Sequence, residues 1–293
     1  MLTLLSRDEV GHLLREAEVA HLGFEASKGP HVTPELFAWT GGRLWFATAR
    51  RTLKARKIET GSRVGILLKR GQHSLAMIGE ARPLDAVRPL SLLLSPHETA
   101  LSPAGMTAFT LRNVRHLAGF IAQGPGACPK PLSTLRMFIS VRPVAAALLR
   151  GNRLLEAEGP WQRGIKLIGG DIDSEPFDVT DVPDDLAAIA DNFASDAVIA
   201  VSTGAGTAVL PATWDPEESV AHVARELLQL AGAREGEAAV EIERMDGYAM
   251  DGKRGVLLRG QMRVTQEGHM SRVEFDPDKA TVWRGMRTKT VPT

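Results

Sequence analysis

The chain has 293 residues, of which 44% are hydrophobic and 24% are charged, and its 35 Lys and Arg residues balance its 35 Asp and Glu residues. This is the composition of an ordinary globular protein, and it excludes a disordered or fibrous chain. A net charge of zero argues against a nucleic-acid-binding protein, which normally carries a basic excess. The length suits two domains better than one.

Cysteine content and hydropathy indicate the compartment. The single cysteine, Cys128, can form neither an internal disulfide nor a cysteine-based zinc site. The N-terminus becomes charged too early for the apolar core of a signal peptide, and no apolar run reaches the length of a membrane span. We therefore expect a cytoplasmic protein that contacts neither membrane nor nucleic acid.

The first half of the chain alternates short strand-like segments with a few helical ones. A Ser/Asp cap and apolar residues at helical spacing predict a helix within residues 6–20. Glycine and proline turns separate the strands that follow. The expected strands are 21–26, 31–39, 43–48, 63–68, 74–83 and one within 135–149, and the expected helices are 51–60 and most of 86–123.

An acidic segment separates this half from a second one. Residues 171–185 carry seven acids and two prolines, which predicts a solvated connection. The segment lacks the later ligands and central glycine of a calcium loop. We divide the chain into domains 1–160 and 161–293. The second domain is expected to contain helices at 183–194 and 216–231 and strands at 197–202, 207–214, 237–244, 254–265 and 272–283.

The two halves repeat each other weakly in sequence but consistently in order. Residues 74–84 align with 255–265, which pairs Gly79 with Gly260. Residues 136–153 align with 272–289, with two residues fewer in the second copy, and each copy ends in an Arg-Gly pair. A tandem duplication of short strands with glycine turns predicts a small barrel in each half. Two such barrels are expected to pack as the subunits of a homodimer would, as a pseudo-dimer.

The most informative segment for chemistry is 43–68. A strand ends at Thr48, a loop with Arg50 and Arg51 follows, and Lys54 lies in the first turn of the next helix. Backbone amides and basic side chains in this arrangement suit a phosphate group. A basic surface helix without a ligand explains the same residues equally well.

This segment resembles the flavin-binding split-barrel superfamily typified by pyridoxamine 5′-phosphate oxidase. The resemblance implies a predominantly β fold with helices, namely tandem split β-barrels. It also implies that Thr48 and Lys54 bind the phosphate of FMN. The family has an arginine where this chain has Leu53, and Arg50 or Arg51 could take its place. The residues that carry the resemblance are Phe46, Thr48, Lys54, Ala55, Arg63 and Val64.

The same resemblance implies contacts with the flavin ring. Thr33 and Phe37 belong to the strand that lines the isoalloxazine in the family, and Ser74 stands in place of a glutamine that touches it. Trp283 resembles the tryptophan of the family's closing strand, which reaches the cofactor from the opposite subunit. One composite site would thus combine Thr48 and Lys54 with Trp283.

The other composite site is expected to be degenerate. Our alignment places Val223 opposite Lys54 and Leu149 opposite Trp283, which predicts one cofactor per chain. Two further motifs fail: residues 200–204 lack the strand-to-helix context of a nucleophile elbow, and 204–206 lack that of a dinucleotide fold. The eight histidines include no pair at metal-ligand spacing, so we expect no metal site.

The leading functional hypothesis is an FMN-dependent oxidoreductase acting on a small molecule, with its catalytic residues unassigned. The stretch 286–289 lacks the histidine with which the family's oxidase holds its substrate, which argues against vitamin B6 oxidation. The alternatives are a deazaflavin-dependent reductase, a non-catalytic flavin- or haem-binding sensor, and a scaffold without a cofactor. Whether the pseudo-dimer pairs further into a homodimer stays open.

Overall fold

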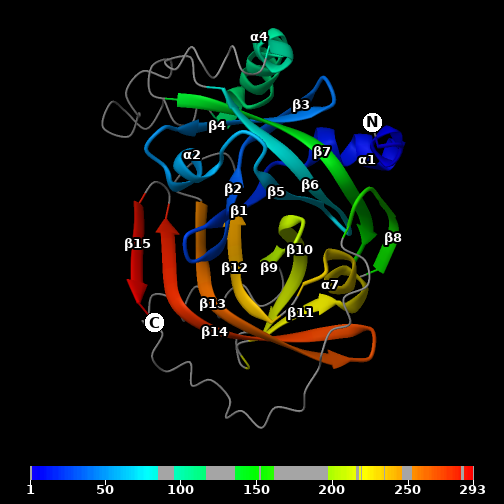
Figure 1. Cartoon of the computed structure of the whole chain (residues 1–293), viewed down its shortest axis with the longest axis vertical. Helices are drawn as coiled ribbons and strands as arrows, with labels where there is room; N and C mark the ends of the chain where they lie inside the picture. The colour runs from blue at the N-terminus through cyan, green and yellow to red at the C-terminus, as the bar shows by residue number, and fades with distance from the viewer. Residues whose placement is uncertain are drawn as a thin grey trace.

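We describe a computed structural model of the chain over residues 2–84, 96–116, 136–151, 153–161, 197–215, 218, 220–233, 235–245, 253–284 and 287–292. Figure 1 shows two β-rich halves, one above the other, with the C-terminal strands at the lower left. Among the described residues, no helix is both long and apolar enough to cross a membrane.

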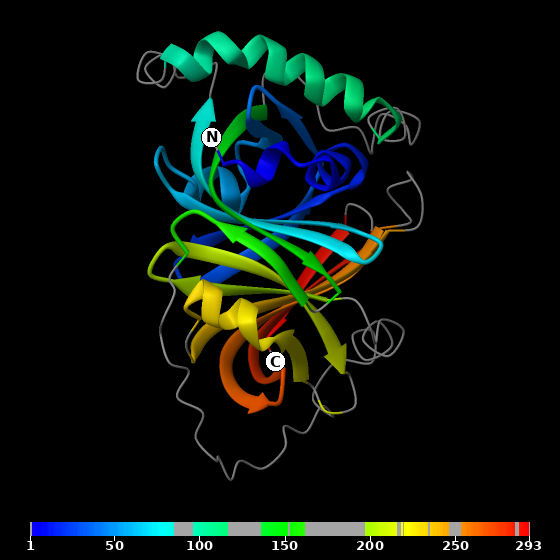
Figure 2. The same cartoon turned by 90° about the vertical axis from the view of Figure 1, so that its right-hand side faces the viewer.

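The first half is one antiparallel sheet with helices at its edges. The sheet order is β2-β1-β5-β6-β7-β4-β3, and β8 pairs with β7. Helix α4 lies across the outer end of this half, far from the second half (Figure 2). The elements are η1 (Leu4–Ser6), α1 (Asp8–Glu16), β1 (Ala20–Ala26), β2 (Gly29–Glu35), β3 (Phe37–Thr40), β4 (Arg43–Ala49), α2 (Leu53–Lys57), β5 (Arg63–Arg70), β6 (His73–Leu84), α4 (Pro96–Arg112), β7 (Arg136–Arg150) and β8 (Arg153–Glu158).

The second half repeats this plan and closes on itself. Its order is β11-β10-β9-β12-β13-β14-β15, and β11 also pairs with β14, which closes the strands from β11 to β14 into a barrel and leaves β15 outside the closure. The elements are β9 (Ala197–Thr203), β10 (Gly206–Asp215), β11 (Val220–Ala224), α7 (Arg225–Ala231), β12 (Gly236–Met245), β13 (Lys253–Glu267), β14 (Met270–Arg284) and β15 (Arg287–Pro292).

The strand orders of the two halves match one for one, as the predicted duplication requires. Strands β1, β2, β5, β6 and β7 occupy the places of β9, β10, β12, β13 and β14, and β4 with α2 matches β11 with α7. Each half is thus built on the split-barrel plan. The prediction of tandem split β-barrels is confirmed, and the described residues are dominated by strands.

The registers of the long hairpins match as well. Gly79 pairs with Pro143 and Gly260 pairs with Pro277, and the register shifts at both glycines. An irregularity of this kind bends a strand, so its presence at the same point in both copies reflects one inherited bend. The two residues that we expected the second copy to lack are not missing from this strand. The pairs Ser74–Leu149 and Gly255–Trp283 on one side of the bulge align the two copies in the same way as the pairs Arg82–Ser140 and Arg263–Glu274 on the other side.

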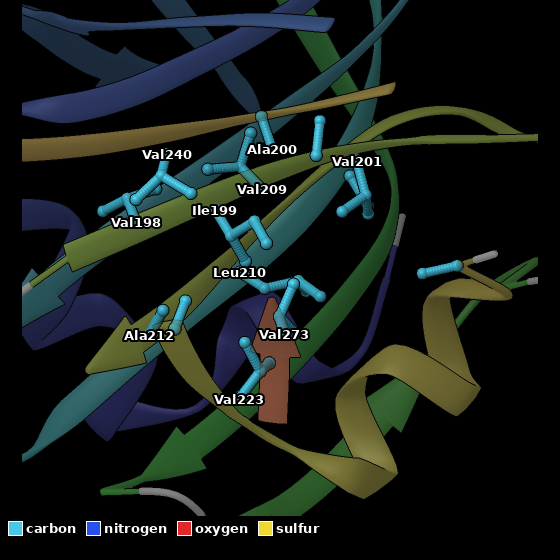
Figure 3. Close-up of a cluster of buried hydrophobic side chains, with 14 of the residues drawn as sticks. Val198, Ile199, Ala200, Val201, Val209, Leu210, Ala212, Val223, Val240 and Val273 are labelled. Carbon is cyan, nitrogen blue, oxygen red and sulfur yellow. The ribbon is translucent and has the colours of Figure 1, made fainter. Parts of the chain in front are cut away.

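The two halves pack face to face about a pseudo-twofold axis. Strand β5 packs on β10 as β12 packs on β2, and β1 packs on β10 as β9 packs on β2. Apolar side chains from both halves form one shared core, in which Val32, Leu67 and Ile78 join the residues of β9, β10 and β12. Figure 3 shows the second half's part of this core. The pseudo-dimer arrangement is therefore confirmed.

Two predicted elements differ in the structure. The expected strand 31–39 is two strands, β2 and β3, which pair with different partners, β1 and β4. The expected helix 216–231 is a strand followed by a helix, because Val220–Ala224 pairs with both β10 and β14 and so closes the barrel. A tertiary contact on each side outweighs local helix propensity here.

Other sequence-based predictions fall outside the described residues. The acidic segment 171–185 and the expected helix 183–194 lie within 162–196, which the structure does not describe. The domain boundary at residue 160 therefore stays a prediction.

Pro34 lies on β2, which is an edge strand of the first sheet, where a residue without an N–H donor is tolerated.

A pair of glycines lets the halves approach closely. Gly23 on β1 and Gly65 on β5 are cross-strand partners. A Cβ atom at Gly65 would lie 2.5 Å from the carbonyl oxygen of Thr207 and 2.8 Å from Val209 Cγ2. The backbone of β10 thus occupies the space that a side chain would fill.

We expect Gly65→Ala to lower the free energy of unfolding by about 1–3 kcal/mol, the usual cost of overpacking. Gly11→Ala in α1 is the control, since its Cβ would meet only the flexible end of Arg15 and alanine suits a helix. Urea denaturation of both variants checks this. An unchanged Gly65→Ala midpoint would mean that the two sheets are less closely packed than described.

Candidate functional site

Two threonine hydroxyl groups fix the N-terminus of α2. Thr52 is the N-cap, and its Oγ1 accepts a hydrogen bond from the Ala55 amide at 3.3 Å. The hydroxyl of Thr48, at the end of β4, lies 2.9 Å from Thr52 Oγ1 and is buried. Thr48 therefore holds the cap of α2 in place, and its predicted contact with a phosphate stays a prediction.

Lys54 reaches from α2 to the edge strand β2. Its Nζ forms an ion pair with Glu35 Oε1 and lies 3.4 Å from Thr33 Oγ1. Thr33 in turn donates a hydrogen bond to Glu35 Oε1 at 3.0 Å. The side chains of Lys54 and Glu35 are only 15% and 12% exposed, so this pair is shielded from solvent. The structure thus joins Thr33 with Lys54, as predicted, and adds Glu35, which sequence reasoning did not assign to the site.

The loop and helix around Lys54 are strongly basic. Arg50, Arg51, Arg56 and Lys57 accompany Lys54 between residues 50 and 57, and this stretch contains no acid. Arg51, Arg56 and Lys57 are exposed, and α2 buries none of its residues. A short helix of this kind is not stabilised by a core, and its concentration of like charge favours an anionic partner.

A residue of the second half also acts on this site. His31 on β2 stacks on Phe24, with ring centroids 5.2 Å apart. Burial, followed by the charges of Arg259 and Lys54, lowers the pKa of His31 from 6.5 to about 4. Arg259 belongs to β13 of the second half, so both halves set the electrostatics of this site. His31 is neutral at pH 7 and adds no positive charge of its own.

These residues suit an anionic group. The Nε of Arg259 is buried without a hydrogen-bond partner among the described residues, and such a donor is costly to leave unsatisfied. Lys54 and the hydroxyl of Thr33 lie near the same imidazole. To bind Lys54, a phosphate would have to displace the carboxylate of Glu35, which forms an ion pair with Lys54. The donor set therefore fits the phosphate of a nucleotide, with Glu35 as an internal competitor.

The remaining predicted residues lie elsewhere. Phe37 is fully buried in the core of the first half, with the Arg112 guanidinium of α4 4.2 Å from its ring centroid. The strand that we expected at 31–39 breaks between β2 and β3, and Phe37 pairs with Phe46 on β4. Its predicted flavin contact stays a prediction.

Ser74 and Trp283 belong to equivalent strand pairs of the two copies, in which Ser74 corresponds to Gly255 and Leu149 corresponds to Trp283. Ser74 pairs with Leu149 on β7, and Gly255 pairs with Trp283 on β14. Ser74 is 6% exposed. The ring of Trp283 covers Gly255, where a Cβ would lie 2.3 Å from Trp283 Cζ2, and it borders the shared core. Their predicted flavin contacts stay predictions.

The structure corrects our alignment of Val223. Val223 pairs with Ser271 on β14, and Thr48 pairs with Met137 at the matching point of β7. Val223 therefore takes the place of Thr48, not of Lys54. The second residue of α2 is Lys54, whereas the second residue of α7 is the acid Glu226.

A cavity lies where the pseudo-twofold axis would place a copy of the composite site. It has a volume of about 640 Å³ and lies between α7 of the second half and the β7–β8 hairpin of the first. Glu226 lines it together with three arginines, so the charge of its lining does not by itself exclude an anion. The predicted loss of the second site stays a prediction. The lining residues are Arg150, Arg153, Arg225, Glu226, Gln229 and His269.

The comparison with protein families agrees with this geometry. Residues 6–86, which span α1 to β6 and include Lys54, match the family model described as pyridoxamine 5′-phosphate oxidase. The first half is a pyridoxamine 5′-phosphate oxidase-like split barrel. The second half is its copy by strand order and register. A search of curated proteins finds no match.

Several solved structures resemble about half of the chain. A pyridoxamine 5′-phosphate oxidase-related, FMN-binding protein from Nostoc punctiforme is 18% identical over 49% of this chain and 84% of its own, with a TM-score of 0.37. An FAD-binding protein from Mesorhizobium loti is 18% identical over 49% and 94%, with a TM-score of 0.32. An F420 reductase is 22% identical over 46% and 92%, with a TM-score of 0.31. Such distant likeness indicates neither a ligand nor a reaction for this chain.

The contact between the halves can be tested through His31. We expect its pKa, about 4 in the native chain, to rise toward 6.5 in Arg259→Met and in Lys54→Met, since each removes a positive charge that opposes protonation. Arg56→Met removes an exposed charge of the same helix and serves as the control. NMR titration of the imidazole measures this. An unchanged pKa in Arg259→Met would contradict the juxtaposition of β13 and β2.

Proposed function

We propose that the chain binds FMN with its phosphate at Lys54 and acts as a flavin-dependent oxidoreductase on a small molecule. The observation that carries the proposal is the shielded cluster of Lys54, Thr33 and Glu35 beside the basic 50–57 loop, within reach of the charge of Arg259. A lysine that a single carboxylate already neutralises is a site where one anion can replace another. The family match over residues 6–86 supports a flavin as the source of that anion.

Electrostatics favours a doubly charged phosphate over the carboxylate of Glu35. A phosphate carries close to two negative charges at neutral pH and three acceptor oxygens. It could therefore accept more charge-assisted hydrogen bonds at Lys54 than Glu35 does, which bonds to Lys54 and Thr33. Charge-assisted hydrogen bonds of this kind are among the stronger ones in proteins.

Bound FMN would supply the hydride or electron transfer, and the chain would supply binding and orientation. Lys54 and Arg259 would hold the phosphate, and Thr48 would keep α2 in position through Thr52. The neutral imidazole of His31 can donate or accept a hydrogen bond without adding charge. We assign no catalytic side chain.

A deazaflavin coenzyme is the second candidate, because it also carries a phosphate. The two coenzymes differ in visible absorption, so the spectrum of freshly purified protein before and after dithionite distinguishes them. Turnover with NAD(P)H separates an enzyme from a protein that merely holds the cofactor. A colourless protein that also fails to take up FMN would contradict the proposal.

We expect Lys54→Ala to weaken FMN binding by about 1.5–3 kcal/mol, the range for a hydrogen bond to a charged group, with little effect on folding. Riboflavin lacks the phosphate, so its affinity should not change. Titration of the apoprotein with both ligands measures this, and Arg56→Ala, which removes an exposed charge on the same helix, is the matched control. Equal losses for FMN and riboflavin would mean that Lys54 does not contact the phosphate.

Glu35→Gln tests the competition directly. The amide keeps the shape of Glu35 but removes the charge that occupies Lys54, so we expect FMN to bind more tightly while riboflavin binding stays the same. The same titration measures both affinities. Weaker FMN binding in Glu35→Gln would show that Glu35 supports the ligand and that no exchange occurs at Lys54.

We expect the cavity beside α7, which is the counterpart of the proposed site, to bind no FMN. Because the second residue of α7 is Glu226, whereas that of α2 is Lys54, we predict close to one FMN per chain, measured by flavin absorbance against protein concentration. Two tight and equivalent sites per chain would contradict the composite site described above.

A further inference from the structure

A second polar cluster lies at the seam between the halves. His21 on β1 meets Glu241 and Glu243 on β12, and His21 Nδ1 lies 3.2 Å from Glu241 Oε2. One ligand atom from each of the three residues lies within 4.8 Å of the other two. The residues are about 220 positions apart in the chain and meet only because the two sheets pack face to face (Figure 1).

The central carboxylate is buried and incompletely satisfied. The side chain of Glu241 is 0% exposed. Its Oε2 faces His21, while its Oε1 is buried and has no hydrogen-bond partner within the described part of the chain. A buried carboxylate oxygen without a partner is costly, and burial of charge is usually compensated by pairing or by a metal ion. The free oxygen of Glu241 is therefore an independent indication that a ligand belongs here.

The cluster is open to solvent on one side. His21, Glu241 and Glu243 line a cavity of about 240 Å³ between the halves, together with Lys69 and Val198. The cavity offers an entry path and room for water molecules. A metal site needs both when the protein supplies fewer ligands than the ion's full coordination.

The pseudo-twofold axis shows how the cluster arose. His21 pairs with Leu67 on β5, and Val198 pairs with Glu241 on β12 at the equivalent point. Glu241 thus stands where the first copy has Leu67, and His21 where the second copy has Val198. Each copy carries only part of the set, so the two halves combine these ligands once, as a result of their divergence.

We propose that His21, Glu241 and Glu243 bind one divalent first-row transition-metal ion between the two halves. One imidazole nitrogen and two carboxylates form a mixed nitrogen and oxygen donor set, which suits Zn²⁺ and its neighbours, whereas Mg²⁺ and Ca²⁺ prefer oxygen ligands alone. Water from the cavity completes the coordination. The ion would join a strand of each half, so its binding stabilises the contact between them.

Lys69 is the cation that the cluster already has nearby. It lines the same cavity, and its charge acts on Glu241. A metal ion must therefore bind against the repulsion of this ammonium group. Lys69→Met removes the repulsion and keeps a side chain of similar length, so it should tighten metal binding about tenfold or more. A merely structural cluster, in which Lys69 neutralises the acids, would instead lose stability and gain no metal affinity.

The test is a titration of the chelator-treated full-length chain with Zn²⁺ by calorimetry, in the absence of flavin. We expect saturation near one ion per chain and a higher thermal midpoint with the metal. His21→Ala and Glu241→Gln should each lose tenfold or more in affinity. Glu237→Gln, an exposed acid on the same strand, should leave the affinity unchanged.

Co²⁺ gives a second measurement that does not depend on the variants folding. Bound Co²⁺ should show d–d absorption typical of nitrogen and oxygen ligands in the native chain, and Zn²⁺ should displace it. Mg²⁺ should neither bind nor displace. No saturable binding by the native chain or by Lys69→Met overturns the proposal, and so does Zn²⁺ binding that His21→Ala and Glu241→Gln leave intact. The titration contains no flavin, and none of these variants changes a residue assigned to the FMN site, so failure here is distinct from failure there.

Discussion

The contact between the two sheets is the constraint on which the rest of the structure depends. Gly23 and Gly65 leave no side chain where the backbone of β10 passes, and the apolar faces of both halves merge into one core. An open split barrel has an uncovered apolar face, and burial of that face against its copy is strongly favourable. Fusion of the two copies makes this contact intramolecular, so it no longer depends on protein concentration.

The same contact determines the chemistry of polar residues near the seam. Burial lowers the pKa of His21 and of His31 to about 4, and burial raises the pKa of Glu241 to about 8. Each shift favours the neutral form of the group. Both histidines hold more protons in the unfolded chain than in the native one, so they cost stability as the pH falls from 6.5 toward 4. Glu241 acts in the opposite sense and costs stability as the pH rises from 4.5 toward 8.

Duplication allowed the copies to specialise. The second residue of α2 is Lys54, whereas the second residue of α7 is Glu226. Lys69 on β5 and Glu243 on β12 are equivalent residues, because their strand partners, Ser74 and Gly255, correspond to each other in the two copies. In a homodimer, both sites would change together with every substitution. In the fused chain, one site can keep its basic loop while the other loses it. The residues of the seam can also become complementary in charge rather than identical.

The sequence by itself determined the duplication, a small barrel in each half and the basic loop around Lys54. These follow from patterns that are local or that repeat, such as the glycines at 79 and 260. Only the tertiary structure decided that Glu35 neutralises Lys54, that Arg259 acts on His31, and that His21 joins Glu241. The reason is physical: these pairs come from strands far apart in the chain, and no spacing within a sequence records which faces of two sheets meet.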